Sequence, residues 1–237
     1  MMMKNQENGE RIMKLVKISK TMIAGLCIAA TLAGAALPTL ALSPAGYTSL
    51  AQIEEMNDDE KAQVQALKAA IAKVNVKYDE VEQDWTIEAP HFKNLSKRKS
   101  CGLSPILYVY NDSDDVAFYE QFSYIGTSKI DVDEIVIRAG DEKYTYTCDY
   151  DNSDLGYDTK MGRWWAVATF DMEADEIDWL REMLSAETII MRFTGVDYTQ
   201  YDYTWTADDR QAVTDMVNLY DLLVAASPEV RARALRG

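Results

Sequence analysis

EIVIRAGDEKYTYTC, residues 134–148, contains two runs in which apolar or aromatic residues alternate with polar ones. Alternation with a period of two is typical of half-buried β-strands. Gly140-Asp141, in the short polar segment between the runs, favours a tight turn. The stretch therefore predicts a β-hairpin, and with it an antiparallel sheet.

Further strand-like runs lie on both sides of this hairpin. They are rich in aromatic and β-branched residues, and Gly, Asn and Asp separate them. Together they predict a mainly antiparallel sheet of six to eight strands. The runs are 74–78, 85–87, 106–110, 116–124, 134–138, 143–150 and 164–170.

Two amphipathic helices are predicted after these strands. Residues 173–186, and a final helix that Thr206 begins, each carry apolar residues at helical spacing. Such stripes need a surface to cover, and the apolar runs 164–170 and 188–193 provide one. We therefore expect an α+β domain over residues 76–227, in which the C-terminal helices pack on one face of the sheet.

The segments on either side of this domain, residues 42–75 and 228–237, are interpreted as an arm and a tail. Residues 42–75 are predicted to form an N-terminal helical arm, because Val64, Leu67 and Ile71 recur at helical spacing after a run of acids. The stripe is expected to pack on the domain, with a helix of a partner as the alternative. Pro228 and three arginines predict a frayed basic tail over residues 228–237.

Residues 1–41 have the order of a secretory signal. Five basic residues precede an uncharged stretch from residue 21 to residue 41, and Thr39 and Ala41 have the spacing of a cleavage site after Ala41. Residues 1–12 are interpreted as a start-site artefact, because Met13 begins a complete signal. We expect an exported protein that is periplasmic, envelope-associated or secreted. A retained membrane anchor is the alternative.

The chain beyond the leader is strongly acidic. Cleavage after Ala41 leaves 19 basic and 37 acidic residues, a net charge of −18. Nucleic acids and anionic membrane surfaces would be repelled by this charge. We therefore expect no nucleic-acid partner and no membrane span after cleavage. Cations, basic partners or simple solubility fit the charge.

Two cysteines, Cys101 and Cys148, remain after the leader. An even pair in an exported chain is typical of a disulfide, so we predict a bond between them. Two free, buried thiols are the alternative.

No motif commits the chain to a reaction, a cofactor or a metal. His91 is the one histidine, and no nucleophile motif surrounds it, so no catalytic residue is assigned. Asp149, Asp151 and Asp154 are candidate calcium ligands in one acidic loop, although the loop does not match the EF-hand pattern. The alternative is a turn-forming loop, because Asp and Asn are common turn residues.

Aromatic residues at strand spacing are the most suggestive feature. Tyr201, Tyr203 and Trp205 share one face of a predicted strand, where they would form a platform for a sugar or a protein partner if exposed. Burial in the core is the alternative. Residues 93–99, KNLSKRK, form the one basic cluster, interpreted as a solvated loop, with a contact to the protein's own acidic surface or to a polyanion as the alternatives.

These observations favour a non-catalytic binding or interaction module at the cell envelope or outside the cell. Its partner would be an envelope or extracellular protein or glycan. The alternative is a carboxylate-dependent hydrolase that acts on envelope or glycan substrates, because the chain offers many carboxylates.

Overall fold

The computed structural model describes residues 11–12, 56–90, 101–110 and 113–236. The chain divides into two units, Met1–Met13 with Asp58–Gly237 and Lys14–Asn57. All sheets and helices below belong to the first unit. Four subjects of sequence-based prediction lie wholly or mostly outside the described residues: the leader apart from residues 11–12, the first part of the predicted arm, His91 and the basic run 93–99.

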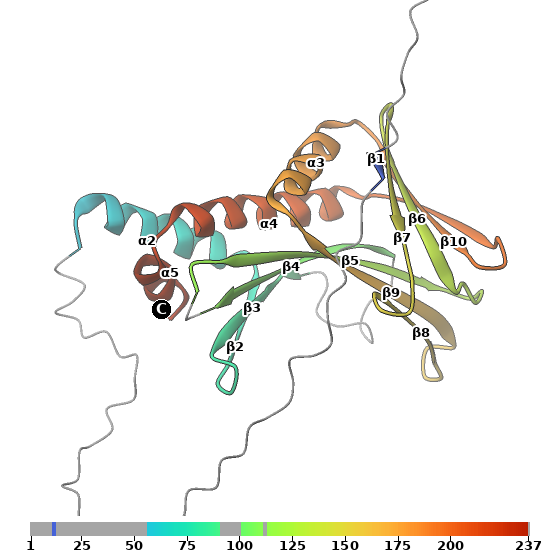
Figure 1. The fold of residues 1–237 in the computed structure, drawn as a ribbon, viewed down its shortest axis with the longest axis horizontal. Coiled ribbons are helices and arrows are strands. Elements are labelled where there is room, and N and C mark those ends of the chain that lie inside the picture. The colour runs from blue at the N-terminus through green and yellow to red at the C-terminus, as the bar shows by residue number, and fades with distance from the viewer. Residues whose placement is uncertain (1–10, 13–55, 91–100, 111–112, 237) are drawn as a thin grey trace, which may run out of the picture. The chain divides into compact units, whose positions relative to one another are not determined.

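The described residues form two sheets and four helices, which confirms the predicted α+β class (Figure 1). The strands divide between two sheets, whereas the sequence predicted them as one. Alternation within a run predicts that a strand forms, but the choice of its neighbour depends on residues far away in the chain.

The first sheet has six strands, all paired antiparallel, in the order β2-β3-β4-β5-β9-β8. Its longest strands, β4, β5 and β9, lie side by side at the centre. The bounds are β2 Asn75–Asp79, β3 Asp84–Glu88, β4 Gly102–Tyr110, β5 Val116–Gly126, β8 Ser153–Asp158 and β9 Arg163–Met172.

The second sheet has five strands in the order β1-β7-β6-β10-β11. The hairpin predicted within residues 134–148 is β6 and β7, and Gly140 has a positive φ of 62° in the turn between them. The pair β1–β7 is parallel and the others are antiparallel. The bounds are β1 Arg11–Ile12, β6 Val132–Ala139, β7 Glu142–Thr147, β10 Ile189–Gly195 and β11 Gln200–Thr204.

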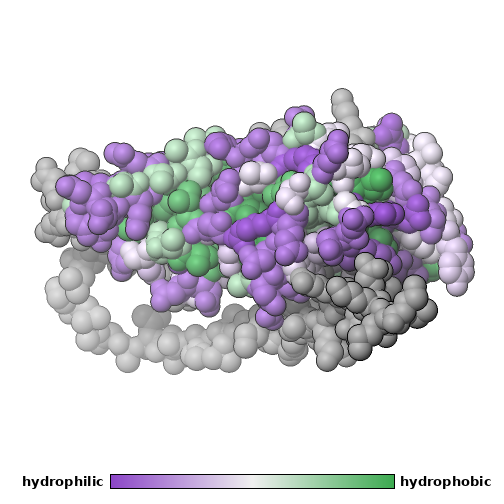
Figure 2. Space-filling view, turned by 90° about the horizontal axis from the view of Figure 1, so that it is seen from above, coloured by the Kyte–Doolittle hydropathy of each residue, from purple (hydrophilic) through white to green (hydrophobic). Residues whose placement is uncertain are grey.

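The helices are α2 Asp58–Ile71, α3 Ala174–Ser185, α4 Ala207–Ala225 and α5 Pro228–Leu235. Helix α4 packs on β4 and β5, and α2 and α3 both contact α4 (Figure 1). Seen from above in Figure 2, hydrophilic residues predominate, with hydrophobic residues between them. The expected packing of helices on one face of a sheet is thus present.

The structure corrects the prediction of a frayed C-terminal end. Residues 228–235 form α5, which begins after the N-cap Ser227 and contacts α2. Arg231 is buried, and its guanidinium donates hydrogen bonds to the carbonyl oxygens of Leu223, at 2.5 Å, and Asp114, at 2.6 Å. A basic sequence packs here because the Arg231 guanidinium donates to carbonyl oxygens at the end of α4, those of Leu223 and Val224, and to the carbonyl oxygen of Asp114.

Aromatic side chains form the contact between the two sheets. Phe122 of β5 and Phe170 of β9 have their ring centroids 4.6 and 5.1 Å from that of Tyr146 of β7. On the same face of β5, Phe118 contacts Tyr220 of α4, with centroids 5.5 Å apart. One face of the six-stranded sheet is therefore covered partly by α4 and partly by the second sheet, and a candidate site lies on the opposite face.

Candidate functional site

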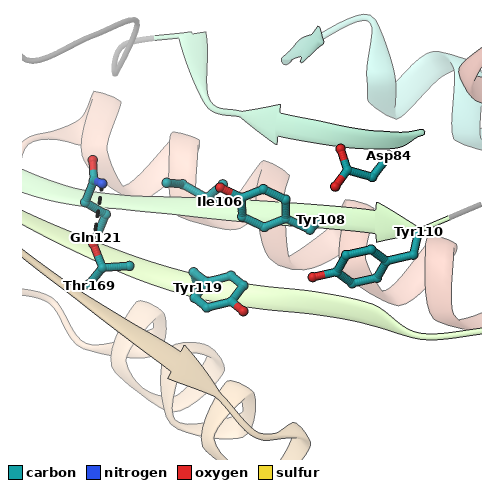
Figure 3. A pocket seen from close by; sticks show the side chains of 7 residues that line it. All are labelled: Asp84, Ile106, Tyr108, Tyr110, Tyr119, Gln121 and Thr169. Carbon is teal, nitrogen blue, oxygen red and sulfur yellow. Dashed lines mark hydrogen bonds between the residues drawn. The ribbon is translucent and has the colours of Figure 1, made fainter. Parts of the chain in front are cut away.

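Four adjacent strands of the six-stranded sheet line an open pocket on the face opposite α4 (Figure 3). The pocket has a volume of about 360 Å³. We call it the tyrosine pocket, and its lining consists of Asp84 of β3, Ile106, Tyr108 and Tyr110 of β4, Tyr119 and Gln121 of β5 and Thr169 of β9.

Strand alternation and register bring these residues together. In β4 the side chains of Tyr108 and Tyr110 point away from the core, whereas Leu107 and Val109, which alternate with them, are buried. Antiparallel pairing then places Asp84 opposite Tyr110, and Ile106 opposite Tyr119. The pocket is therefore assembled from segments that lie far apart in the sequence.

Three of the seven residues that line the pocket are half-buried tyrosines. The rings of Tyr108 and Tyr119 meet edge to face with centroids 5.4 Å apart, and the hydroxyl groups of Tyr110 and Tyr119 point toward each other (Figure 3). At one end of the pocket, the Gln121 Nε2 donates a hydrogen bond to the Thr169 Oγ1 at 3.5 Å. The pocket thus offers ring faces together with hydroxyl and amide groups.

Carboxylates surround the rings. Glu88 follows Asp84 on the same face of β3, and Asp171 of β9 lies opposite Tyr119. Burial raises the pKa of Tyr108, and the negative charges of Glu88 and Asp84 raise it further. Burial and then Asp171 raise the pKa of Tyr119 to about 12.

Burial and then Asp84 also raise the pKa of Tyr110. All three hydroxyl groups are therefore protonated at neutral pH and can both donate and accept hydrogen bonds. The charged side chains that raise these pKa values, Asp84, Glu88 and Asp171, are all carboxylates. Chemically, this arrangement can stack against a flat or apolar group, hydrogen-bond it, and attract positive charge.

The three aromatic residues predicted from the sequence do not form an exposed platform. Trp205 is only 6% exposed and lies in the core. The Tyr203 hydroxyl donates to the Asp209 Oδ2 at 2.7 Å, close to the start of α4. Tyr201 is 39% exposed, and its ring meets that of Tyr124 edge to face at 5.3 Å. Of the three, Trp205 alone is a core residue, Tyr203 is half-buried and Tyr201 is exposed.

Two of the candidate calcium ligands, Asp149 and Asp151, lie in a turn, and the third, Asp154, lies in β8. The Asp149 Oδ1 accepts hydrogen bonds from the backbone N–H groups of Asp151, at 3.0 Å, and Asn152, at 3.2 Å. Asp151 and Asp154 are exposed. Within the described ranges, no group of three or more His, Cys, Asp or Glu side chains could hold a metal ion.

The predicted disulfide is absent from the structure, in which Cys101 and Cys148 are free and buried. Cys101 immediately precedes β4, and its Sγ accepts a hydrogen bond from the Ile125 N–H at 3.3 Å. Cys148 follows β7 in the other sheet, where its N–H donates to the carbonyl oxygen of Asp133 at 2.7 Å. The division of the strands into two sheets gives the cysteines different neighbours.

Sequence reasoning did not single out the tyrosine pocket. Tyr108 and Tyr110 have the same two-residue spacing as Tyr201 and Tyr203. The apolar Val109 between Tyr108 and Tyr110 is a signal that these two tyrosines face away from the core. Tyr119 could be added only with the register between β4 and β5, which is a property of the sheet.

No helix in the part of the chain that the structure describes is long and apolar enough to cross a membrane. Comparisons with known protein families, with curated proteins and with solved structures find no significant match, so the candidate site rests on its geometry alone.

Proposed function

We propose that this chain is an exported, non-catalytic binding module that holds its partner at the tyrosine pocket. The observation that carries the proposal is the group of three half-buried tyrosine rings in one open pocket on a sheet face. Tyrosine provides a large, rigid contact area and a hydroxyl group, and it is enriched at binding surfaces for this reason.

Three further features support this proposal. The pocket spans four strands, so the sheet holds the rings in fixed positions and little side-chain freedom is lost on binding. Their hydroxyl groups keep their protons at neutral pH, because burial and nearby carboxylates raise the pKa values. The leader in the sequence favours a partner at the envelope or outside the cell, either a protein or a glycan.

The test uses three soluble probes with the chain that begins at Leu42. They are an oligomer of N-acetylglucosamine, a short peptide of alternating lysine and glycine, and the same peptide with glutamine in place of lysine. Isothermal titration calorimetry should detect binding of at least one probe. Tyr119→Ala should weaken this binding by about fivefold or more, because it removes a central ring of the pocket.

Tyr157→Ala is the matched control, because Tyr157 of β8 is 49% exposed and its ring contacts Trp164, away from the pocket. It should leave binding unchanged. Thermal unfolding of both variants checks that they fold, and Tyr110→Ala replaces Tyr119→Ala if the latter does not. The proposal is overturned if no probe binds, if Tyr157→Ala has the same effect, or if a probe is cleaved by the parent.

A further inference from the structure

We infer that the tyrosine pocket selects positive charge, and that its ligand is a protein segment presenting lysine or arginine side chains. This inference rests on the proposed function of the same pocket and names the chemical class of its partner.

The charges around the pocket have one sign. Its lining includes the carboxylate of Asp84 and no basic side chain. Glu88 lies on the same face of β3, opposite Ile106, and Asp171 lies on β9, opposite Tyr119. Carboxylates therefore flank the tyrosines on both sides: Asp84 and Glu88 on β3, and Asp171 alone on β9.

Among the residues that the structure describes, a cation on the same face of the sheet lies on the next strand. This cation is Lys77 of β2, which is paired in register with Thr86 of β3. Asp79 follows Lys77 by two residues on β2. The backbone N–H groups of Val81 and Glu82, and to a smaller extent Lys77, lower the pKa of Asp79. Lys77 thus lies near a carboxylate of its own strand, and among the described residues no ion pair involves Asp84, Glu88 or Asp171.

The tyrosine rings favour the same charge. The negative face of an aromatic ring attracts an ammonium or guanidinium group within about 6 Å, and partial removal of water strengthens the attraction. Nearby carboxylates make ionisation of the three hydroxyl groups unfavourable, because like charges repel. The same negative charges attract a bound cation. A neutral sugar would use the rings but not these charges.

The shape of the pocket fits an extended segment. Four neighbouring strands line it, and with strands about 4.8 Å apart the lining extends roughly 14 Å across the sheet. A peptide that crosses the strands can place successive basic side chains beside β3 and β9 while its backbone lies over the rings. Anionic polymers are excluded by repulsion.

The experiment compares the lysine peptide with the glutamine peptide in calorimetric titrations at low salt. The lysine peptide should bind at least about tenfold more tightly, and raising the salt to half molar should remove most of this preference. Asp84→Asn should weaken binding of the lysine peptide by about threefold to tenfold, as expected for a partly desolvated charge contact.

Glu142→Gln is the matched control. Glu142 is an exposed acid of β7 in the other sheet, so this variant removes the same charge from the chain without touching the pocket. Its affinity for the lysine peptide should equal that of the parent. If Asp84→Asn does not fold, Glu88→Gln tests the same side of the pocket.

The outcomes separate this inference from the proposed function. Equal effects of Asp84→Asn and Glu142→Gln would mean diffuse attraction to an acidic protein and would overturn the inference. Binding of the N-acetylglucosamine oligomer that Tyr119→Ala abolishes, with no preference for the lysine peptide, would overturn the inference while the proposed function stands. If no probe binds the parent, both are overturned.

Discussion

Glu120 is an acidic residue in a fully buried environment. It lies on the core face of β5, is 0% exposed, and neither oxygen of its carboxyl makes a hydrogen bond of normal geometry. Burial raises its pKa to about 8, although the Tyr146 hydroxyl acts in the opposite direction. The folded chain therefore retains this proton at pH values where the unfolded chain has lost it.

We predict that Glu120→Gln stabilises the protein in a pH-dependent way. The folded-state pKa is above the ordinary value of 4.5, so the stability of the parent should fall as the pH rises from about 4.5 toward 8. The variant should gain about 2–4 kcal/mol in the free energy of unfolding at pH 8 and almost nothing at pH 4. Urea unfolding at both pH values measures the difference. An equal gain at pH 4 would contradict the explanation, and Glu142→Gln should show no such trend.

At the scale of single elements, the start of α4 connects a helix to the strand before it. The Asp209 Oδ2 accepts hydrogen bonds from the Thr206 N–H, the Thr206 hydroxyl and the Tyr203 hydroxyl, each at 2.7 Å. Thr206 in turn accepts from the Asp209 N–H at 3.2 Å. This reciprocal cap fixes where α4 begins and ties it to β11.

We predict that Asp209→Ala lowers the free energy of unfolding by about 2–3 kcal/mol, because it leaves the Tyr203 hydroxyl and a capping N–H without their partner. Asp208→Ala is the control, since Asp208 is exposed in the same helical turn and lies outside this network. It should cost well under 1 kcal/mol. If urea unfolding gives the same loss in the free energy of unfolding for both variants, the negative charge near the helix end matters and the hydrogen-bond network does not.

At the scale of the whole described unit, two sheets and a set of helices share one aromatic core. The arrangement places Cys101 beside β5 of one sheet and Cys148 beside β6 of the other. Burial raises the pKa of both thiols, that of Cys148 to about 12. Both side chains thus behave as small, unreactive core residues.

We predict that the folded chain beginning at Leu42 reacts with a thiol reagent only slowly at neutral pH. On unfolding without a reductant it should release two thiols per chain, because both cysteines are free. Cys148→Ser should lower this number to one. Absence of reactive thiols in the unfolded parent would show that a disulfide exists after all.

The sequence by itself determined the features that depend on neighbouring residues. The alternation around Gly140 predicted the hairpin of β6 and β7, and Thr206 predicted the beginning of α4. The α+β class followed from such local patterns, because the hydrophobic period of a strand or helix, and the capping residues of a helix, are visible within a few consecutive residues.

The tertiary structure alone decided which strands are neighbours and which faces are covered. The same spacing of aromatic residues leads to a pocket at Tyr108 and Tyr110 but to packing at Tyr203 and Trp205. It also determined that the cysteines remain apart and that α5 is anchored through Arg231. These outcomes depend on contacts between residues far apart in the chain, and no local pattern encodes which distant segment will cover a given face.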